Sequence, residues 1–132
     1  TAFDWLIANA AGVTLQNTDL TQGYYASVNE LIWFDINAWN SSVLINNGTP
    51  DAAGNVTRYV IHRMCKTAGA AYNATGQLCS LNFPQGGAIG GSMAVGAVTF
   101  PGSPQLYYRV SIRVDGPRNS TSVTQVNILI QT

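Results

Sequence analysis

The segment Tyr107–Ile130, which reads YYRVSIRVDGPRNSTSVTQVNILI, decides the fold that we expect for this chain. Apolar and polar residues alternate on both sides of its central Asp-Gly-Pro-Arg-Asn, and this period of two is typical of strands with one buried face. Glycine, proline and asparagine favour turns, so the two runs are expected to form an antiparallel hairpin. The first strand has a predicted buried face of Tyr108, Val110, Ile112 and Val114 and a predicted solvated face of Tyr107, Arg109, Ser111, Arg113 and Asp115.

A hairpin alone is marginal in water, so another element must cover its apolar face. The segment Thr1–Ala11 is the candidate, because apolar residues recur in it at helical spacing and Gly12 follows where a C-terminal cap would lie. Thr1 and Asp4 have the spacing of a capping box, although this helix could equally be the end of a longer one. The predicted contact joins Phe3, Leu6, Ile7 and Ala10 of the helix to Tyr108, Val110 and Ile112 of the sheet.

Two further segments, Ser42–Ile45 and Val56–Cys65, are predicted to be strands of a second hairpin, because many turn-forming residues separate them. Asp35 is placed to cap one short helical turn. The long Gly- and Pro-rich stretch Phe83–Gln105 contains a candidate edge strand, Met93–Phe100. Together these patterns predict an α+β fold, with an N-terminal helix packed on an antiparallel β-sheet.

Composition limits the class of protein. The sequence of residues 1–132 has the size of a single domain and can bury about 70% of its unfolded surface. Only 9% of the residues are charged, and six basic side chains match six acidic ones, so nucleic acid is not an expected partner. No apolar run reaches the ~20 residues that a membrane-spanning helix needs.

Cys65 and Cys79 are the only cysteines, and small or polar residues fill most of the segment between them. Such a loop can bring its ends within disulfide distance, and closing it would stabilise the fold by roughly 3 kcal/mol. We therefore favour a disulfide, with two unrelated buried thiols as the alternative. A disulfide would place the protein in an oxidising compartment.

No motif in the sequence indicates catalysis or a cofactor. His62 is the only histidine, and with two cysteines it cannot complete a tetrahedral zinc site unless carboxylates contribute. His62 and Cys65 lie three residues apart on one predicted strand, so their side chains point to opposite faces and do not form a nucleophile–base pair. The sequence also lacks a Gly-x-Ser-x-Gly elbow. We expect a protein that is not an enzyme, with no catalytic residue, cofactor or metal.

Trp33 and Trp39 lie in the most apolar stretch of the chain, Asn29–Asn40. Two such rings can form a platform for sugars, which would suit a secreted carbohydrate- or protein-binding module. In a chain with so few charges, however, large aromatic residues are more often part of the core, and we favour that interpretation.

Three parts of the sequence together resemble the C-terminal domain of the PilX-class type IV pilus assembly proteins, a class of bacterial minor pilins. The most specific part is Tyr107–Asn119, YYRVSIRVDGPRN, with VTQV at Val123–Val126. The second part is RYVIHRMC at Arg58–Cys65, and the third combines Ala2–Leu6 with Gly23–Tyr25. The similarity therefore touches both ends of the chain and its middle.

The resemblance implies a pilin-like fold, a disulfide between the two cysteines and a role in assembly. Resembling proteins join other pilins and minor pilins, and a tip adhesin, in a complex that primes type IV pilus assembly at or near the tip. Some of them influence adhesion and bacterial aggregation. They lie in the inner membrane and periplasm before assembly and on the cell surface afterwards.

A preceding apolar helix anchors the resembling proteins, and this sequence contains no such segment. Thr1–Ala11 is therefore expected to be the soluble end of a longer helix, and any membrane contact would be made through the missing part. The 132 residues by themselves are then expected to be monomeric. The Gly-rich segment Gly86–Gly102 would remain for weak contacts between heads.

Overall fold

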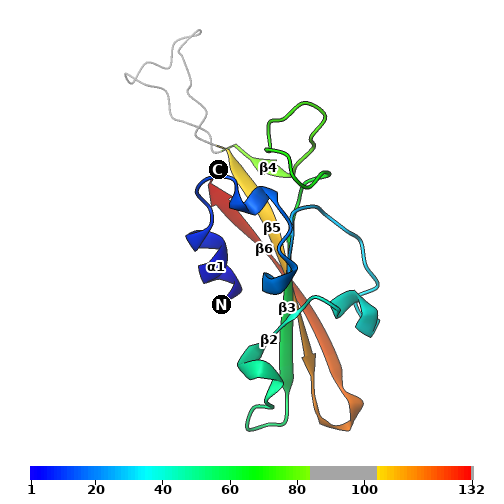
Figure 1. Cartoon of the computed structure of the whole chain (residues 1–132). Coiled ribbons are helices and arrows are strands. Elements are labelled where there is room, and N and C mark those ends of the chain that lie inside the picture. Colours follow the sequence, from blue (N-terminus) through cyan, green and yellow to red (C-terminus); the bar gives the residue numbers. More distant parts are fainter. Residues whose placement is uncertain (84–103, 132) are drawn as a thin grey trace, which may run out of the picture.

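The computed structural model describes residues 1–83 and 104–131 (Figure 1). The candidate edge strand at residues 93–100 and the Gly-rich segment at residues 86–102 lie outside this described part of the chain. One short N-terminal helix accompanies an open, mostly antiparallel sheet, so the fold is of the mixed α and β kind that the sequence predicts. Short 3-10 turns lie at Thr14–Gln16, Leu20–Gln22, Ile36–Trp39, Ile45–Gly48 and Pro117–Asn119.

The hairpin predicted from the C-terminal part of the sequence is the largest part of the sheet. β5 (Gln105–Asp115) and β6 (Thr121–Gln131) pair antiparallel along their full length. In the turn between them, Arg118 and Asn119 have φ values of 61° and 58°, in the left-handed region that reverses the chain. The predicted hairpin is confirmed.

β5 is the longest strand with neighbours on both sides, and it pairs with three other strands. β6 occupies one side, while β3 (Val56–Arg63) and β4 (Leu81–Asn82) follow one another along the other side. The outer side of β3 pairs with two short strands, β1 (Tyr24–Tyr25) in parallel and β2 (Val43–Leu44) in antiparallel orientation. The predicted hairpin of β2 and β3 is also confirmed, whereas no sequence pattern predicted β1.

The helix α1 (Ala2–Ala8) begins as predicted and ends earlier. Thr1 caps its start, since the Thr1 Oγ1 accepts a hydrogen bond from the Asp4 backbone N–H over 3.5 Å. At the other end, the Asn9 side-chain amide donates to the Trp5 carbonyl oxygen over 2.8 Å, and Asn9 leaves the helical conformation with φ −109° and ψ 8°. The helix therefore makes only about two turns.

Leu6 anchors α1 to the first face of the sheet, and its side chain is fully buried. It belongs to the same core cluster as Tyr108 and Val110, and Ile112 packs at the margin of that cluster. This much of the predicted contact between helix and sheet is present. Ile130 of β6 completes the cluster on the side of the helix.

Phe3 and Ile7 differ from the prediction, because each is 51% exposed. The partly buried helix-side residues that pack beside Leu6 are Ala2, Trp5 and Ala10. A helix presents only one stripe to a flat sheet, and the stripe centred on Leu6 turns Phe3 and Ile7 away from the middle of the contact. Apolar spacing alone could not distinguish these two stripes.

Replacing Leu6 with alanine should lower the free energy of unfolding by about 2–5 kcal/mol, because it leaves a cavity between α1 and the sheet. Ile7→Ala is the matched control, since Ile7 is adjacent in the same helix and half exposed, and its cost should stay below about 1 kcal/mol. Denaturant midpoints, compared at equal m-values, measure the loss of stability in both variants. A loss for Ile7→Ala as large as that for Leu6→Ala would show that the helix packs through its other stripe.

Candidate functional site

The second face of the sheet, opposite α1, is covered as well. Ser111 is fully buried and Arg113 is only 9% exposed, so the prediction of a solvated face is wrong at these two positions. The cover comes from the segment of residues 30–39, whose side chains and backbone contact β3 and β5 in this region. Strand alternation places residues on a face correctly, but it does not show whether a loop returns over that face.

Four rings pack together on this second face: Tyr25, Trp33, Trp39 and His62, here called the aromatic cluster. Tyr25 stacks on His62 with ring centroids 4.8 Å apart and an angle of 6° between the planes. Trp33 meets His62 edge-on at 5.7 Å and Trp39 edge-on at 5.4 Å. These geometries are the favourable ones for aromatic pairs.

The loop holds its tryptophans in place by local hydrogen bonds. Asp35 caps the 3-10 turn Ile36–Trp39, as predicted, by accepting from the Asn37 N–H over 2.9 Å. The Trp39 indole N–H donates to the Trp33 carbonyl oxygen over 2.7 Å. Trp39 is 1% exposed, which confirms the core interpretation for this residue and removes one ring from any sugar platform.

His62 is the buried titratable group of the cluster, with 2% of its surface exposed. Neither ring nitrogen has a hydrogen-bond partner among the described residues. Burial, and then the charge of Arg109 directly opposite on β5, lowers the pKa of His62 from 6.5 to about 4. The imidazole is therefore neutral at neutral pH. The Cys65 sulfur is bonded to Cys79, so His62 has no thiol there to activate.

Two arginines share one carboxylate at the other end of this face. The Arg113 Nε lies 2.9 Å and 3.1 Å from the two Asp115 carboxylate oxygens, and the Arg58 Nε lies 3.8 Å from one of them. Arg113 also donates to the Phe34 carbonyl oxygen over 3.4 Å, which ties the covering loop to β5. Arg109 adds a second tie through Glu30 at 3.8 Å. The Arg113 hydrogen bond and the Arg109–Glu30 ion pair thus join the covering loop to β5.

The outer side of the same loop is apolar. Ile32, Phe34 and Ile36 are 78%, 68% and 50% exposed, respectively, and we call these three residues the loop patch. Single exposed apolar side chains are common, but three within five residues on a loop that is fixed from below indicate a surface for recognition. No side chain in the patch has acid–base or nucleophilic chemistry.

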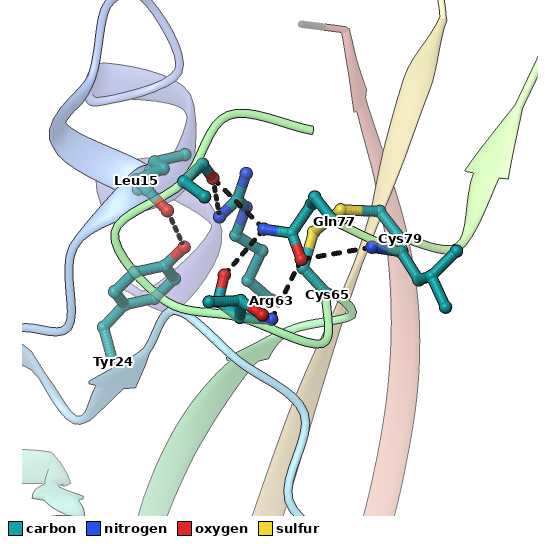
Figure 2. Close-up of a disulfide and its surroundings, with 9 residues drawn as sticks. Leu15, Tyr24, Arg63, Cys65, Gln77 and Cys79 are labelled. Carbon is teal, nitrogen blue, oxygen red and sulfur yellow. Dashed lines mark hydrogen bonds between the residues drawn. A yellow bond between two sulfur atoms is a disulfide. The ribbon is translucent and has the colours of Figure 1, made fainter. Parts of the chain in front are cut away.

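Figure 2 shows the disulfide between Cys65 and Cys79, which confirms the predicted pairing. The bridged loop is also ordered from within: the Gln77 side chain accepts from the Thr67 N–H over 2.9 Å and donates to the Thr67 carbonyl oxygen over 2.6 Å. The buried Arg63 donates to the Ala70 carbonyl oxygen over 2.9 Å. The loop between the cysteines is therefore held at both its base and its middle.

A shallow apolar groove of about 270 Å³ lies on the first face, between the start of α1 and the sheet. Phe3, Tyr59, Ile112 and Ile128 are among its lining residues.

Within the described residues, no three His, Cys, Asp or Glu side chains are placed to hold a metal ion. The same residues contain no helix with the length and apolarity to cross a membrane.

Sequence reasoning missed β1 and, with it, the stack of Tyr25 on His62. One available signal was Gly23, which has φ +63° and whose added Cβ would lie 3.1 Å from the Ser41 carbonyl oxygen and 3.2 Å from that of Tyr59. A glycine before two aromatic residues is consistent with close approach of a strand. The sequence contains no signal for the neighbour that it approaches.

No protein-family model, curated protein or solved structure matches this chain.

Removing the disulfide with the pair Cys65→Ser and Cys79→Ser should lower the free energy of unfolding by about 3 kcal/mol, because the unfolded chain regains the freedom of a loop of this length. Chemical denaturation compares the variant with the wild-type protein. Alkylation of the unfolded wild-type protein without reductant should modify no thiol by intact mass. Two modified thiols would mean that the bond does not form in solution.

The stability of the wild-type protein should fall as the pH drops from about 6.5 to about 4. Over that range the unfolded chain binds a proton at His62 while the folded chain, with its lowered pKa, does not. The slope attributable to His62 should reach about 1.4 kcal/mol per pH unit. His62→Phe keeps a ring against Tyr25 and cannot titrate, so the difference between its stability and that of wild type isolates the effect. Parallel pH profiles for the two proteins would contradict it.

Proposed function

We propose that this chain is the head of a non-enzymatic minor-pilin-like subunit that takes part in type IV pilus assembly or priming, at or near the pilus tip. The supporting observation is that the resembling segments, scattered in the sequence, meet in space. Arg58–Cys65 contains β3 and Tyr107–Asn119 contains most of β5, and these two strands pair side by side. Gly23–Tyr25 reaches β3 through β1, Val123–Val126 lies on β6, and Ala2–Leu6 includes the buried anchor of α1.

This convergence supports the proposal, because segments that resemble a family by chance need not lie together in the fold. Here they form the centre of the sheet and its helix contact, which is the part that specifies a fold. A pilin-like fold, with one helix against an antiparallel sheet, is the arrangement that the resemblance implies. The loops outside the resembling segments carry the loop patch.

The disulfide supports a location outside the cytoplasm. Disulfides persist in oxidising compartments, which include the periplasm and the cell surface. The proposed course is therefore passage through the inner membrane and periplasm to the surface pilus. A preceding apolar helix would supply the membrane anchor in this proposal.

The proposed partners are other pilins and minor pilins, with adhesion or aggregation as further effects of the assembled complex. The loop patch supports contact with protein, because it presents apolar side chains on a rigid base. A secreted sugar-binding module has less support, since Trp39 is buried against Trp33 and cannot stack on a ligand. Nucleic acid is not proposed as a partner at a net charge of zero.

Deletion of the gene in its own bacterium tests the proposal. We expect fewer sheared surface pili than in the parent strain, and recovery when the wild-type gene is restored. The tagged protein should be found by immunodetection in sheared pili or in inner-membrane complexes with minor pilins. Normal piliation, with the protein only in the culture medium, would favour a secreted binding module instead.

A paired variant sharpens this test. Phe34→Ser removes the central side chain of the loop patch, whereas Leu78→Ser alters a side chain that is 69% exposed elsewhere on the surface. Both variants should fold with near wild-type stability, because both sites are exposed. We expect only Phe34→Ser to reduce recovery of pili.

A further inference from the structure

Among the described residues, no other strand pairs with the outer edge of β6. Its sequence from Thr121 to Gln131, TSVTQVNILIQ, contains no charged residue, proline or glycine. Within the described residues, β6 pairs only with β5. Natural sheets usually protect such an edge with charges, prolines, bulges or short strands, because a free strand edge pairs readily with another strand. β6 has none of these features and pairs with β5 without a bulge.

The hydrogen-bonding groups on this edge can be assigned. In the turn, the Gly116 N–H donates to the Ser120 carbonyl oxygen over 2.8 Å, and antiparallel pairs alternate from there between bonded and non-bonded. Tyr107 confirms which pairs are non-bonded. It lies opposite Leu129, but its N–H donates to the Ser80 carbonyl oxygen and its carbonyl oxygen accepts from the Met64 N–H, both on the side of β5 away from β6. The backbone groups that face outward are therefore those of Thr121, Val123, Gln125, Asn127 and Leu129.

We propose that this edge pairs with β6 of a second copy of the chain, in antiparallel orientation, and joins the two sheets into one dimer. In a two-fold antiparallel pair of identical strands, a residue near the centre lies opposite or beside its own copy, so a charge there would meet a like charge. β6 carries none. The net charge of the whole chain is zero, so two copies also approach without long-range repulsion. This inference does not rest on the proposed role in pili.

The opposite edge of the sheet explains why pairing stops at two copies. It consists of β1 and β2 along β3 and of β4 along β5, and each of these three strands has only two residues. Such short strands are poor templates for further pairing. Within the described residues, the two β6 edges therefore satisfy each other in a closed two-fold contact and leave only these short strands at the outer edges of the joined sheet. Val126 and Leu129, which are 46% and 38% exposed, gain cover from the partner on opposite faces.

The proposed dimer differs from the monomer that the sequence led us to expect. That expectation considered apolar side chains only, whereas the contact here is made by backbone groups. Because a single strand edge buries less surface area than a standard protein–protein interface, the dimer is weak and its population depends on protein concentration.

Amide hydrogen exchange of the full 132-residue chain, followed by NMR, tests the inference together with sedimentation equilibrium. Between roughly 10 µM and roughly 1 mM protein, the mass should shift from monomer to dimer. The outward N–H groups of Val123, Gln125 and Asn127 should exchange about tenfold more slowly at the higher concentration. The inward N–H groups of Val126 and Ile128 should be protected from exchange at both protein concentrations.

Two variants of one residue separate backbone pairing from side-chain effects. Gln125→Ala and Gln125→Pro both lose the side-chain hydrogen bond to Ser111, but only the proline removes an outward N–H. We expect Gln125→Ala to dimerise and Gln125→Pro to remain monomeric. Val126→Lys provides a second disruption that keeps every N–H, and protection of the inward amides shows that each variant is folded. A monomer at every concentration, or outward amides whose protection does not depend on concentration, would overturn the proposal.

Discussion

The pairing of β3 with β5 is the constraint on which the rest of this structure depends. Eight residue pairs fix one register, and because side chains alternate, that register decides what each face contains. It aligns Ile61 with Val110 on the first face, under α1, and His62 with Arg109 on the second, under the aromatic loop. A shift of β3 by one residue relative to β5 would turn His62 and Arg58 toward the apolar core and Ile61 away from it.

The two faces are closed by different physical means. Leu6 and its neighbours cover the first face by apolar burial, which is non-directional and tolerates small adjustments. The second face buries polar groups, and these need specific partners. Arg113 donates hydrogen bonds to both the Asp115 carboxylate and the Phe34 carbonyl oxygen of the covering loop. The second face is therefore the one that specifies a single loop position, and it fixes the loop patch on its outer side.

The described residues present three kinds of contact surface. The loop patch offers apolar side chains and the groove beside α1 offers an apolar recess. The outer edge of β6 offers backbone groups that pair with no other strand of the described residues. These differ in selectivity: side-chain patches distinguish partners by shape, whereas a strand edge accepts any compatible strand. On the other side of the sheet, β1 and β2 have only two residues each and present shorter edges than β6.

The sequence by itself determined the elements whose signals are local. Alternation and turn residues specified the β5–β6 hairpin, and Thr1 and Asp4 specified the start of α1. Asp35 indicated the turn Ile36–Trp39, and the two cysteines indicated their disulfide. Only the tertiary structure decided which helix stripe is buried and that Ser111 and Arg113 are covered. It also decided that Tyr25 pairs with β3 and stacks on His62. The reason is physical: spacing along the chain fixes the direction in which a side chain points, but burial depends on segments distant in sequence that return over it.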